Sequence, residues 1–350
     1  MNGQSGRLSG QNQSRQVLSR RALLRALGSS AAALGLAGCA GMAASGPQFD
    51  ASRLATKPTL LVATTRKPIS GARAKPWFGP ERGGVTIAAQ AKLTPPDSSR
   101  FSLAAIGLDD WRLDSVEMLP GQVADLAAQA SQGRDILIYV HGYKNTFESA
   151  ALDAVRLADG ISFRGDAMVF SWPSRAGLLD YAYDRESAMY SRDALESVLD
   201  ALMATPGGSR VHIVAHSLGT MVTLESLRQL YAHHGDAAAA KIGAVIFAAP
   251  DIDMDVFTSS IPRLGALARK ITVISASNDL ALAVSRKIAG GVARVGAAEK
   301  VELERLGVRV IDATGEGWGV INHDLFLSND SVRQVIRSAV EGAGTSFAAG

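Results

Sequence analysis

The sequence predicts an α/β fold in which helices cover both faces of a mostly parallel sheet. Strand-like and helix-like segments alternate from Thr59 onward, which is the pattern of such a sheet. Residues 136–140 are an unbroken apolar run, as expected of a central parallel strand that is buried on both faces. With 47% hydrophobic residues and one cysteine in 350 residues, the chain is expected to depend on an ordinary buried core rather than on disulfides.

The expected elements follow one another along the chain. Residues 59–65 form the first strand, and residues 84–88 and 101–106 are expected to be antiparallel partners near one edge of the sheet. Residues 290–307 are expected to be a loop or a short helix. Further strands are expected at 135–140, 167–170, 211–215, 242–248, 271–275 and 308–311, and helices with a 3.6-residue apolar period at 147–158, 184–204, 218–232, 253–267, 280–289 and 330–341.

The first 38 residues resemble a twin-arginine export signal that ends in a lipoprotein cleavage box. Arg20 and Arg21 precede an apolar run at 26–38, which is shorter than the ~20 residues that a membrane-spanning helix needs. Cys39 follows Leu36-Ala37-Gly38, where a lipoprotein would carry its acyl chains. The sequence therefore predicts a signal peptide at 1–38 and a lipid anchor on Cys39 in a bacterial cell envelope.

The basic excess of the chain belongs to this leader. Residues 1–38 hold five arginines and no acidic residue, so the rest of the chain has 31 basic and 33 acidic residues. No nucleic-acid partner is therefore expected. Residues 39–57 are rich in Ala, Ser and Gly, which predicts a flexible tether. Residues 58–345 are expected to form the folded domain. Because no aspartate follows Cys39 directly, we expect an outer-membrane location facing the periplasm.

Ser217 is the candidate nucleophile. It lies at the turn between the strand at 211–215 and the helix at 218–232, with Ala215 and Gly219 two positions to either side. Small residues are needed there because larger side chains would collide as the chain reverses around a strained nucleophile. In turns of this kind the residue two positions before the nucleophile is usually glycine. Here it is Ala215, which is larger than glycine by one methyl group. The alternative is a serine that only caps the following helix.

An acid and a base follow Ser217 in the order in which such triads occur. Asp279 comes directly after the strand at 271–275 and is the favoured acid, with Asp251 and Asp253 after the preceding strand as alternatives. Each of these aspartates could instead cap a helix, and Asp251 is well placed to do so. His323, after the last strand, is the favoured base, and a solvent-facing loop histidine is its alternative. The other histidines fit this role less well: His141 is upstream, His212 is inside a strand, His216 adjoins the nucleophile, and His233 and His234 end a helix.

The loop after the strand at 136–140 supplies the remaining part of the expected site. Acyl transfer creates an oxyanion, and the backbone N–H groups of Tyr143 and Leu218 are expected to bind it. Gly142 lets the backbone turn close to the substrate, although such a glycine is also common for structural reasons alone. Trp172 and Tyr183 are candidates for the wall of the acyl pocket, with core packing as the favoured alternative.

Taken together, these motifs make residues 57–340 resemble the alpha/beta-hydrolases of the group catalogued as domain of unknown function 900. The resemblance implies that a Ser-His-Asp triad hydrolyses an ester-like bond through an acyl-enzyme, in a small molecule or a lipid, with no settled substrate. A thioesterase or acyltransferase, and an inactive envelope lipoprotein, are the alternatives. The resemblance also rests on Val62–Arg66, Val140–Tyr143, Val169–Ser174, Tyr183–Ala188, Phe247–Asp251 and Asn322–Asp324.

No cofactor or metal is expected from the sequence. It contains no His-Glu-x-x-His, no phosphate-binding loop and no Gly-x-Gly-x-x-Gly that opens a helix. Only about 20 residues, 251–270, separate two core strands at the point where larger hydrolases insert a cap. We therefore expect no large cap domain and an open cleft.

Overall fold

The computed structural model describes the greater part of the expected hydrolase domain. The described residues are 58–69, 75–97, 110–121, 123–130, 134–177, 180–204, 209–276, 279, 282–283, 285, 291–314, 327 and 329–345. They all belong to one of the two units into which the chain divides, Phe49–Gly350. The expected signal peptide, the tether with Cys39, the strand at 101–106, and His323 lie outside the described residues.

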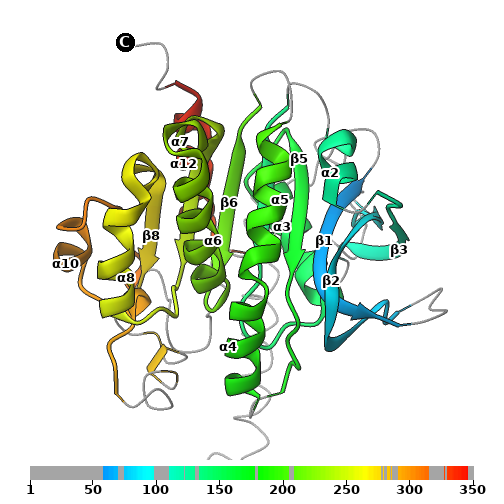
Figure 1. The fold of residues 1–350 in the computed structure, drawn as a ribbon, viewed down its shortest axis with the longest axis horizontal. Coiled ribbons are helices and arrows are strands. Elements are labelled where there is room, and N and C mark those ends of the chain that lie inside the picture. Colours follow the sequence, from blue (N-terminus) through cyan, green and yellow to red (C-terminus); the bar gives the residue numbers. More distant parts are fainter. Residues whose placement is uncertain are drawn as a thin grey trace, which may run out of the picture. The chain divides into compact units, whose positions relative to one another are not determined.

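The described strands form one nine-stranded sheet in the order β3-β2-β1-β5-β4-β6-β7-β8-β9 (Figure 1). The pairs β1–β2 and β2–β3 are antiparallel, and every other pair is parallel. This arrangement confirms the predicted mostly parallel α/β sheet. The strands are β1 Thr59–Pro68, β2 Phe78–Thr94, β3 Arg112–Met118, β4 Ile136–Val140, β5 Asp166–Ser171, β6 Val211–His216, β7 Ile242–Ala248, β8 Ile271–Ser275 and β9 Arg309–Asp312.

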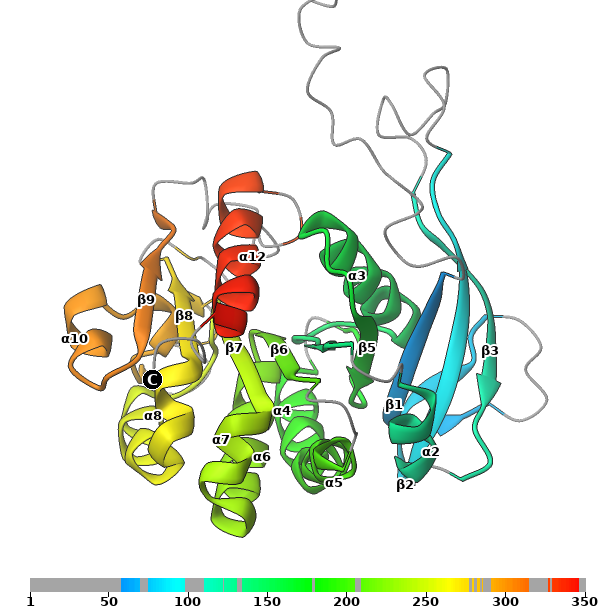
Figure 2. The same ribbon diagram turned by 90° about the horizontal axis from the view of Figure 1, so that it is seen from above.

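Helices cover both faces of the sheet, and each face has its own core (Figure 2). Alternate residues of β4 enter different cores: Ile136 and Ile138 pack on one side, and Leu137 and Tyr139 on the other. One face is covered by α3 Phe147–Gly160 and α12 Asp330–Thr345, and the other by α2 Val123–Gln129, α5 Arg192–Met203, α6 Gly219–His234 and the 3₁₀ helix η3 Ile261–Lys270. The remaining helices are α4 Tyr181–Tyr190, α7 Asp236–Lys241, α8 Met254–Ser260, η4 Val295–Ala297 and α10 Lys300–Glu304.

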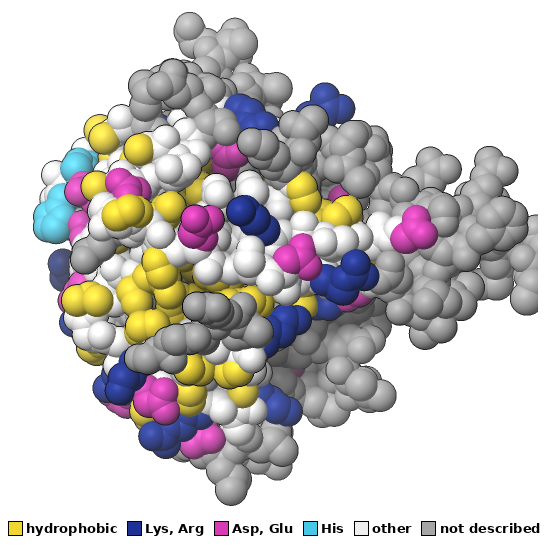
Figure 3. Space-filling model, turned by 90° about the vertical axis from the view of Figure 1, so that its right-hand side faces the viewer, with side chains coloured by type: hydrophobic (Ala, Val, Ile, Leu, Met, Phe, Trp, Pro, Cys, Tyr) yellow, Lys and Arg dark blue, Asp and Glu magenta, His cyan; other side chains and the backbone are white. Residues whose placement is uncertain are grey.

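The antiparallel edge differs from the sequence expectation. Strand β2 is far longer than the expected 84–88, and β3 at Arg112–Met118 was not expected at all. Its short sequence mixes exposed Arg112, Asp114 and Glu117 with few apolar residues, so its apolar pattern is weak. Charged side chains of this kind discourage pairing with another chain at an open sheet edge. Figure 3 shows this side of the molecule, where acidic and basic side chains are interspersed with hydrophobic ones.

Two predicted helices are interrupted. The expected helix at 184–204 is two helices, α4 and α5, which meet at Ser191. The Ser191 hydroxyl donates to Ser187 O (2.8 Å) and lies 2.7 Å from Thr65 Oγ1, so polar contacts fix the break. The expected helix at 253–267 is α8 followed by η3, whose Gly265 has φ +50°.

Three of the other predicted helices are confirmed, and one lies mostly outside the described residues. The helices expected at 147–158, 218–232 and 330–341 are confirmed as α3, α6 and α12, and the region 290–307 contains the short helices η4 and α10. Of the helix expected at 280–289, only Leu282, Ala283 and Ser285 are described. The short helices α2 and α7 were not expected. No helix in the described ranges combines the length and apolarity that crossing a membrane requires.

Candidate active site

Ser217 occupies a strained turn between β6 and α6. Its φ is +49°, a left-handed conformation that costs a residue with a side chain about 1–2 kcal/mol. Backbone contacts hold the turn: Ser217 N donates to Ala248 O (3.0 Å), and Thr220 Oγ1 donates to Ser217 O (2.6 Å). Leu218, and not Ser217, is the N-cap residue of α6, and no side chain caps that helix. Ser217 is therefore held in this conformation without serving as the helix cap.

The small residues around Ser217 allow two loops to interlock. A β-carbon on Gly219 would lie 2.6 Å from Val140 O and closer still to His141 O, so α6 begins against the end of β4. A β-carbon on Gly142 would lie 2.8 Å from His216 Nδ1. Ala215 replaces the usual glycine and is fully buried in the core, which accommodates its methyl group.

Two backbone N–H groups beside this turn, those of Tyr143 and Leu218, are the expected oxyanion donors. Among the hydrogen bonds of the described residues, none uses the N–H of Tyr143 or of Leu218. The Tyr143 side chain turns elsewhere: its hydroxyl donates to Gly177 O (2.6 Å), and its ring meets Tyr181 edge-on. Burial raises the pKa of Tyr143, and the charges of nearby Asp184 and Asp180 raise it further.

Asp279 follows β8 at the same edge of the sheet as Ser217, because the carboxyl ends of parallel strands lie together. It is 3% exposed. Its Oδ1 accepts a hydrogen bond from Leu282 N (3.1 Å), and its own N–H donates to Ala276 O (3.2 Å). The acid expected from the sequence is therefore a buried carboxyl at the expected strand end.

Asp251 is the centre of a second buried cluster that touches the nucleophile turn. Its N–H donates to Ser217 O (3.3 Å), and its carboxylate forms an ion pair with Arg294 (3.2 Å). Tyr181 donates to one carboxylate oxygen (2.8 Å) and Ser285 to the other (2.6 Å). Burial and the charge of Asp251 raise the pKa of Tyr181 to about 12.

Asp253 has a structural role. Its side chain accepts hydrogen bonds from the N–H groups of Asp255 (2.8 Å) and Val256 (3.2 Å), which makes it the N-cap of α8. The capping role that was an alternative for each of the three aspartates therefore belongs to Asp253, whereas Asp251, which also seemed well placed for it, has other partners.

His141 and Trp172 form a packed pair behind the loop that contains Gly142. Their rings stack with centroids 4.6 Å apart, and Trp172 Nε1 donates to His141 O (2.8 Å). His141 Nδ1 lies 2.8 Å from Gly142 O, and its Nε2 lies 3.1 Å from both the N–H and the carbonyl oxygen of Trp172. Burial, followed by the charge of Arg66, lowers the pKa of His141 to about 3. Trp172 is fully buried, so it packs the core rather than lining a pocket.

The remaining candidates lie as follows. Tyr183 is partly exposed on α4, where its hydroxyl donates to Pro80 O (3.1 Å) and Arg175 stacks on its ring (3.7 Å). His212 lies inside β6 near Asp135 (3.2 Å). His233 and His234 end α6 beside Glu196 and Asp200, as the sequence suggested.

Sequence reasoning gave no role to two buried charged residues, Arg66 and Asp184. Both belong to motifs that carry the family resemblance, and both contact the loops around Tyr143. Arg66 could have been found because it is a charged residue three positions after the apolar run Leu60–Ala63, and a charge next to buried residues is usually paired. Within the described part of the chain, no three His, Cys, Asp or Glu side chains gather as a metal site would require.

Comparison with solved structures finds several hydrolases. Aspergillus fumigatus lipase B is 11% identical, with 60% of this chain and 53% of that chain covered and a TM-score of 0.41. An esterase from Pyrobaculum calidifontis is 13% identical, with 85% and 91% covered and a TM-score of 0.39. An a/b serine hydrolase without lid from Xanthomonas campestris is also 13% identical, with 74% and 89% covered and a TM-score of 0.36.

Comparison by sequence finds a relative and a family. The uncharacterized protein alr1448 of a Nostoc species is 33% identical over 61 residues, which are 17% of this chain and 16% of that protein. The model of the family described as "Alpha/beta hydrolase of unknown function (DUF900)" matches residues 122–339, more than half of the chain. The sheet order and the strand-turn-helix at Ser217 agree with an alpha/beta-hydrolase fold. The chain therefore belongs to the DUF900 family of alpha/beta hydrolases.

Proposed function

We propose that this hydrolase cleaves carboxylic esters through a serine nucleophile, Ser217, with His323 as base and Asp279 as acid. The observation that carries the proposal is the strained turn at Ser217, φ +49°, next to two amides that no described residue occupies. Strained backbone conformations cluster at active sites, and a strained strand-to-helix turn carries the nucleophile in alpha/beta hydrolases. Esterases and a lipase are among the proteins named in the comparison with solved structures.

The proposed reaction has two acyl-transfer steps. His323 takes the proton of Ser217 Oγ as this oxygen attacks the ester carbonyl, and Asp279 stabilises the imidazolium that forms. The N–H groups of Tyr143 and Leu218 donate to the carbonyl oxygen, which becomes an oxyanion. The tetrahedral intermediate collapses when His323 gives its proton to the departing alkoxide, which leaves as an alcohol. Water, deprotonated by His323, then attacks the acyl-serine. His323 returns this proton to Ser217 Oγ as the acid leaves, which restores the enzyme.

The partners of Asp251 argue against this residue as the triad acid. Arg294 already compensates the carboxylate of Asp251, which also accepts hydrogen bonds from two hydroxyl groups. An imidazolium beside Asp251 would therefore add a second cation to a pair that is already neutral. Asp279 follows β8, the strand from which the acid is expected.

The proposal also covers the cellular location. After export through the twin-arginine signal at 1–38, Cys39 becomes the lipidated first residue, and 39–57 tether the domain to the outer membrane on its periplasmic side. Three acyl chains would hold the protein firmly, since each buried methylene contributes ~0.8 kcal/mol. Mass spectrometry of the mature N-terminus tests this part. A chain that retains residues 1–38, or a soluble protein with unmodified Cys39, would contradict it.

The reaction is tested with p-nitrophenyl esters of increasing chain length and a fluorophosphonate probe. Wild type should hydrolyse at least one ester and be labelled by the probe, and Ser217→Ala should do neither. His323→Ala should lose most of the rate, and the double variant should lose little more, because triad members act as a unit. Labelling that persists in Ser217→Ala would show that the nucleophile lies elsewhere. Thioesters in the same panel distinguish an esterase from a thioesterase.

A further inference from the structure

Arg66 is a buried cation that joins three segments at the carboxyl end of the sheet. It is 1% exposed, and its guanidinium donates to Ser171 Oγ (2.9 Å), Ser174 O (3.1 Å) and Asn145 O (2.7 Å). Burial lowers its pKa to about 10, so it stays protonated near neutral pH. The planar guanidinium fork can satisfy several acceptors at fixed angles, which a lysine cannot do.

Asp184 on α4 is a buried carboxylate that accepts hydrogen bonds from the same two loops. Its carboxylate accepts hydrogen bonds from the Ser174 hydroxyl, from Arg175 N (2.9 Å) and from Lys144 N (3.4 Å). Burial raises the pKa of this carboxyl, while the hydrogen bonds and the charge of Arg66 act in the opposite direction. Lys144 has φ +63°, so the hydrogen bond from its N–H supports a bend that a non-glycine residue seldom adopts.

Ser174 connects the two charged residues. Its carbonyl accepts from Arg66, its hydroxyl donates to Asp184, and the same hydroxyl oxygen accepts from Asn145 N (3.2 Å). The segment Lys144–Asn145 is thus tied to this cluster by Lys144 N, Asn145 N and Asn145 O.

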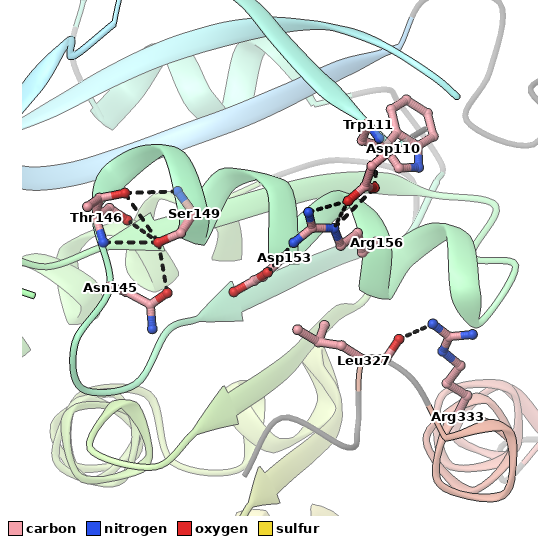
Figure 4. A network of polar contacts seen from close by, with 9 residues as sticks. All are labelled: Asp110, Trp111, Asn145, Thr146, Ser149, Asp153, Arg156, Leu327 and Arg333. Atoms are coloured by element: carbon pink, nitrogen blue, oxygen red, sulfur yellow. Dashed lines mark hydrogen bonds and ion pairs between the residues drawn. The ribbon is translucent and has the colours of Figure 1, made fainter. Parts of the chain in front are cut away.

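The two ends of the loop are fixed as well. At the start, His141 is held by Trp172 and contacts Gly142 O. At the end, Asn145 Oδ1 accepts from Ser149 Oγ (2.9 Å), and Thr146 and Ser149 cap α3 reciprocally (Figure 4). Tyr143 N–H lies between these fixed points and remains free of any described partner.

We infer that Arg66 and Asp184 are positioning residues that hold the loop 142–145 in the shape in which Tyr143 N–H binds the oxyanion. This inference rests on the proposed ester hydrolysis. Removing either buried charge leaves the other uncompensated and lowers stability, so the rates below refer to the folded protein. The contacts of Arg66 and Asp184 are concentrated on the two loops after β4 and β5. Removal of either side chain should therefore lower the reaction rate more than it weakens substrate binding.

The test uses Arg66→Lys, Asp184→Asn and the milder Ser174→Ala. We expect kcat for the best p-nitrophenyl ester to fall roughly 10- to 100-fold with KM changed less than about threefold, since oxyanion contacts act mainly in the transition state. The affinity for a trifluoromethyl ketone, which forms a tetrahedral adduct with a nucleophilic serine, should fall by the same factor as kcat/KM. Asp135→Asn is the matched control.

Asp135 is a partly exposed carboxyl at the other end of β4, with Arg210 N (2.7 Å) and His212 Nε2 (3.2 Å) as partners. Its loss should lower the melting temperature and leave kcat and the ketone affinity unchanged. The inference is overturned if folded Asp184→Asn or Ser174→Ala keeps wild-type kcat, or if kcat falls while ketone affinity does not. A wild-type protein that neither hydrolyses esters nor reacts with the fluorophosphonate would instead refute the proposed function itself.

Discussion

The backbone of Gly142 lies so close to Ser217 that a β-carbon added to Gly142 would be 2.9 Å from Ser217 Cβ. Real Cβ contacts are essentially never shorter than 3.0 Å, so any side chain there would push the two loops apart. The turn at Ser217 and the loop that contains Tyr143 can therefore approach this closely only because residue 142 has no side chain.

Gly142→Ala should separate the nucleophile from the oxyanion amide. Because removal of one oxyanion donor costs about 10²- to 10³-fold in kcat, we expect a loss of roughly that size, measured with the best ester substrate. Gly342→Ala on α12 is the control, since no described atom lies within 4 Å of its β-carbon. It should keep full activity. Equal activity of the two variants would show that the contact between the loops is unimportant for the reaction.

Ser217→Gly should be more stable than Ser217→Ala. Both variants lack the nucleophile, but only glycine relieves the strain of φ +49°. We expect a difference of about 1 kcal/mol in the free energy of unfolding, because the left-handed conformation costs about 1–2 kcal/mol and the flexible unfolded glycine offsets part of the gain. Urea unfolding of the two inactive proteins measures the difference. If Ser217→Ala is as stable as Ser217→Gly, the turn is not strained.

Much of the fold could be predicted because its signals are local. Apolar runs marked β4, β6, β7 and β8 to within a residue or two, and a 3.6-residue period marked α3 and α6. The weakly patterned edge strand β3 and the break at Ser191 could not be predicted. Side-chain contacts to other segments, such as Thr65 with Ser191, decide the latter.

The candidate site shows the same limit. Ser217 and its small neighbours are recognisable because chain reversal restricts the residues within a few positions. Arg66, in contrast, acts on Asn145, which is 79 positions away, and Asp184 acts on Lys144, 40 positions away. No local pattern shows which distant loop a buried charge will hold. The sequence motifs could therefore indicate that these residues matter, but not what they do.

Asp279→Asn and Asp251→Asn should have opposite effects. Loss of the triad acid typically lowers kcat about 10⁴-fold while the protein stays folded, and we expect this of Asp279→Asn. Asp251→Asn leaves Arg294 buried without its counter-charge, which costs about 3–5 kcal/mol of stability. The folded fraction of that variant should keep most of its activity. Steady-state kinetics combined with urea unfolding separates the two outcomes, and a reversed pattern would make Asp251 the acid.

His141 should make the protein less stable as the pH falls from 7 to 5. Its pKa in the folded state is about 3 because burial and Arg66 disfavour the charged ring, whereas an unfolded histidine has a pKa of 6.5. Below pH 6.5 the unfolded chain therefore binds a proton that the folded chain cannot take up. The stability from this group is complete above pH 6.5 and is lost progressively toward pH 3.

The expected loss from this one group between pH 7 and pH 5 is about 2 kcal/mol. His141→Gln removes the titrating ring but keeps a donor and an acceptor for Gly142 O and Trp172 N. The variant should be less stable than wild type at pH 7, because it loses the ring stacked on Trp172, and its stability should depend less on pH. Urea unfolding of both proteins at pH 7 and pH 5 measures this difference. If both lose the same stability over this range, His141 is not held neutral in the folded protein, and its ring cannot be the fixed support of the Gly142 loop.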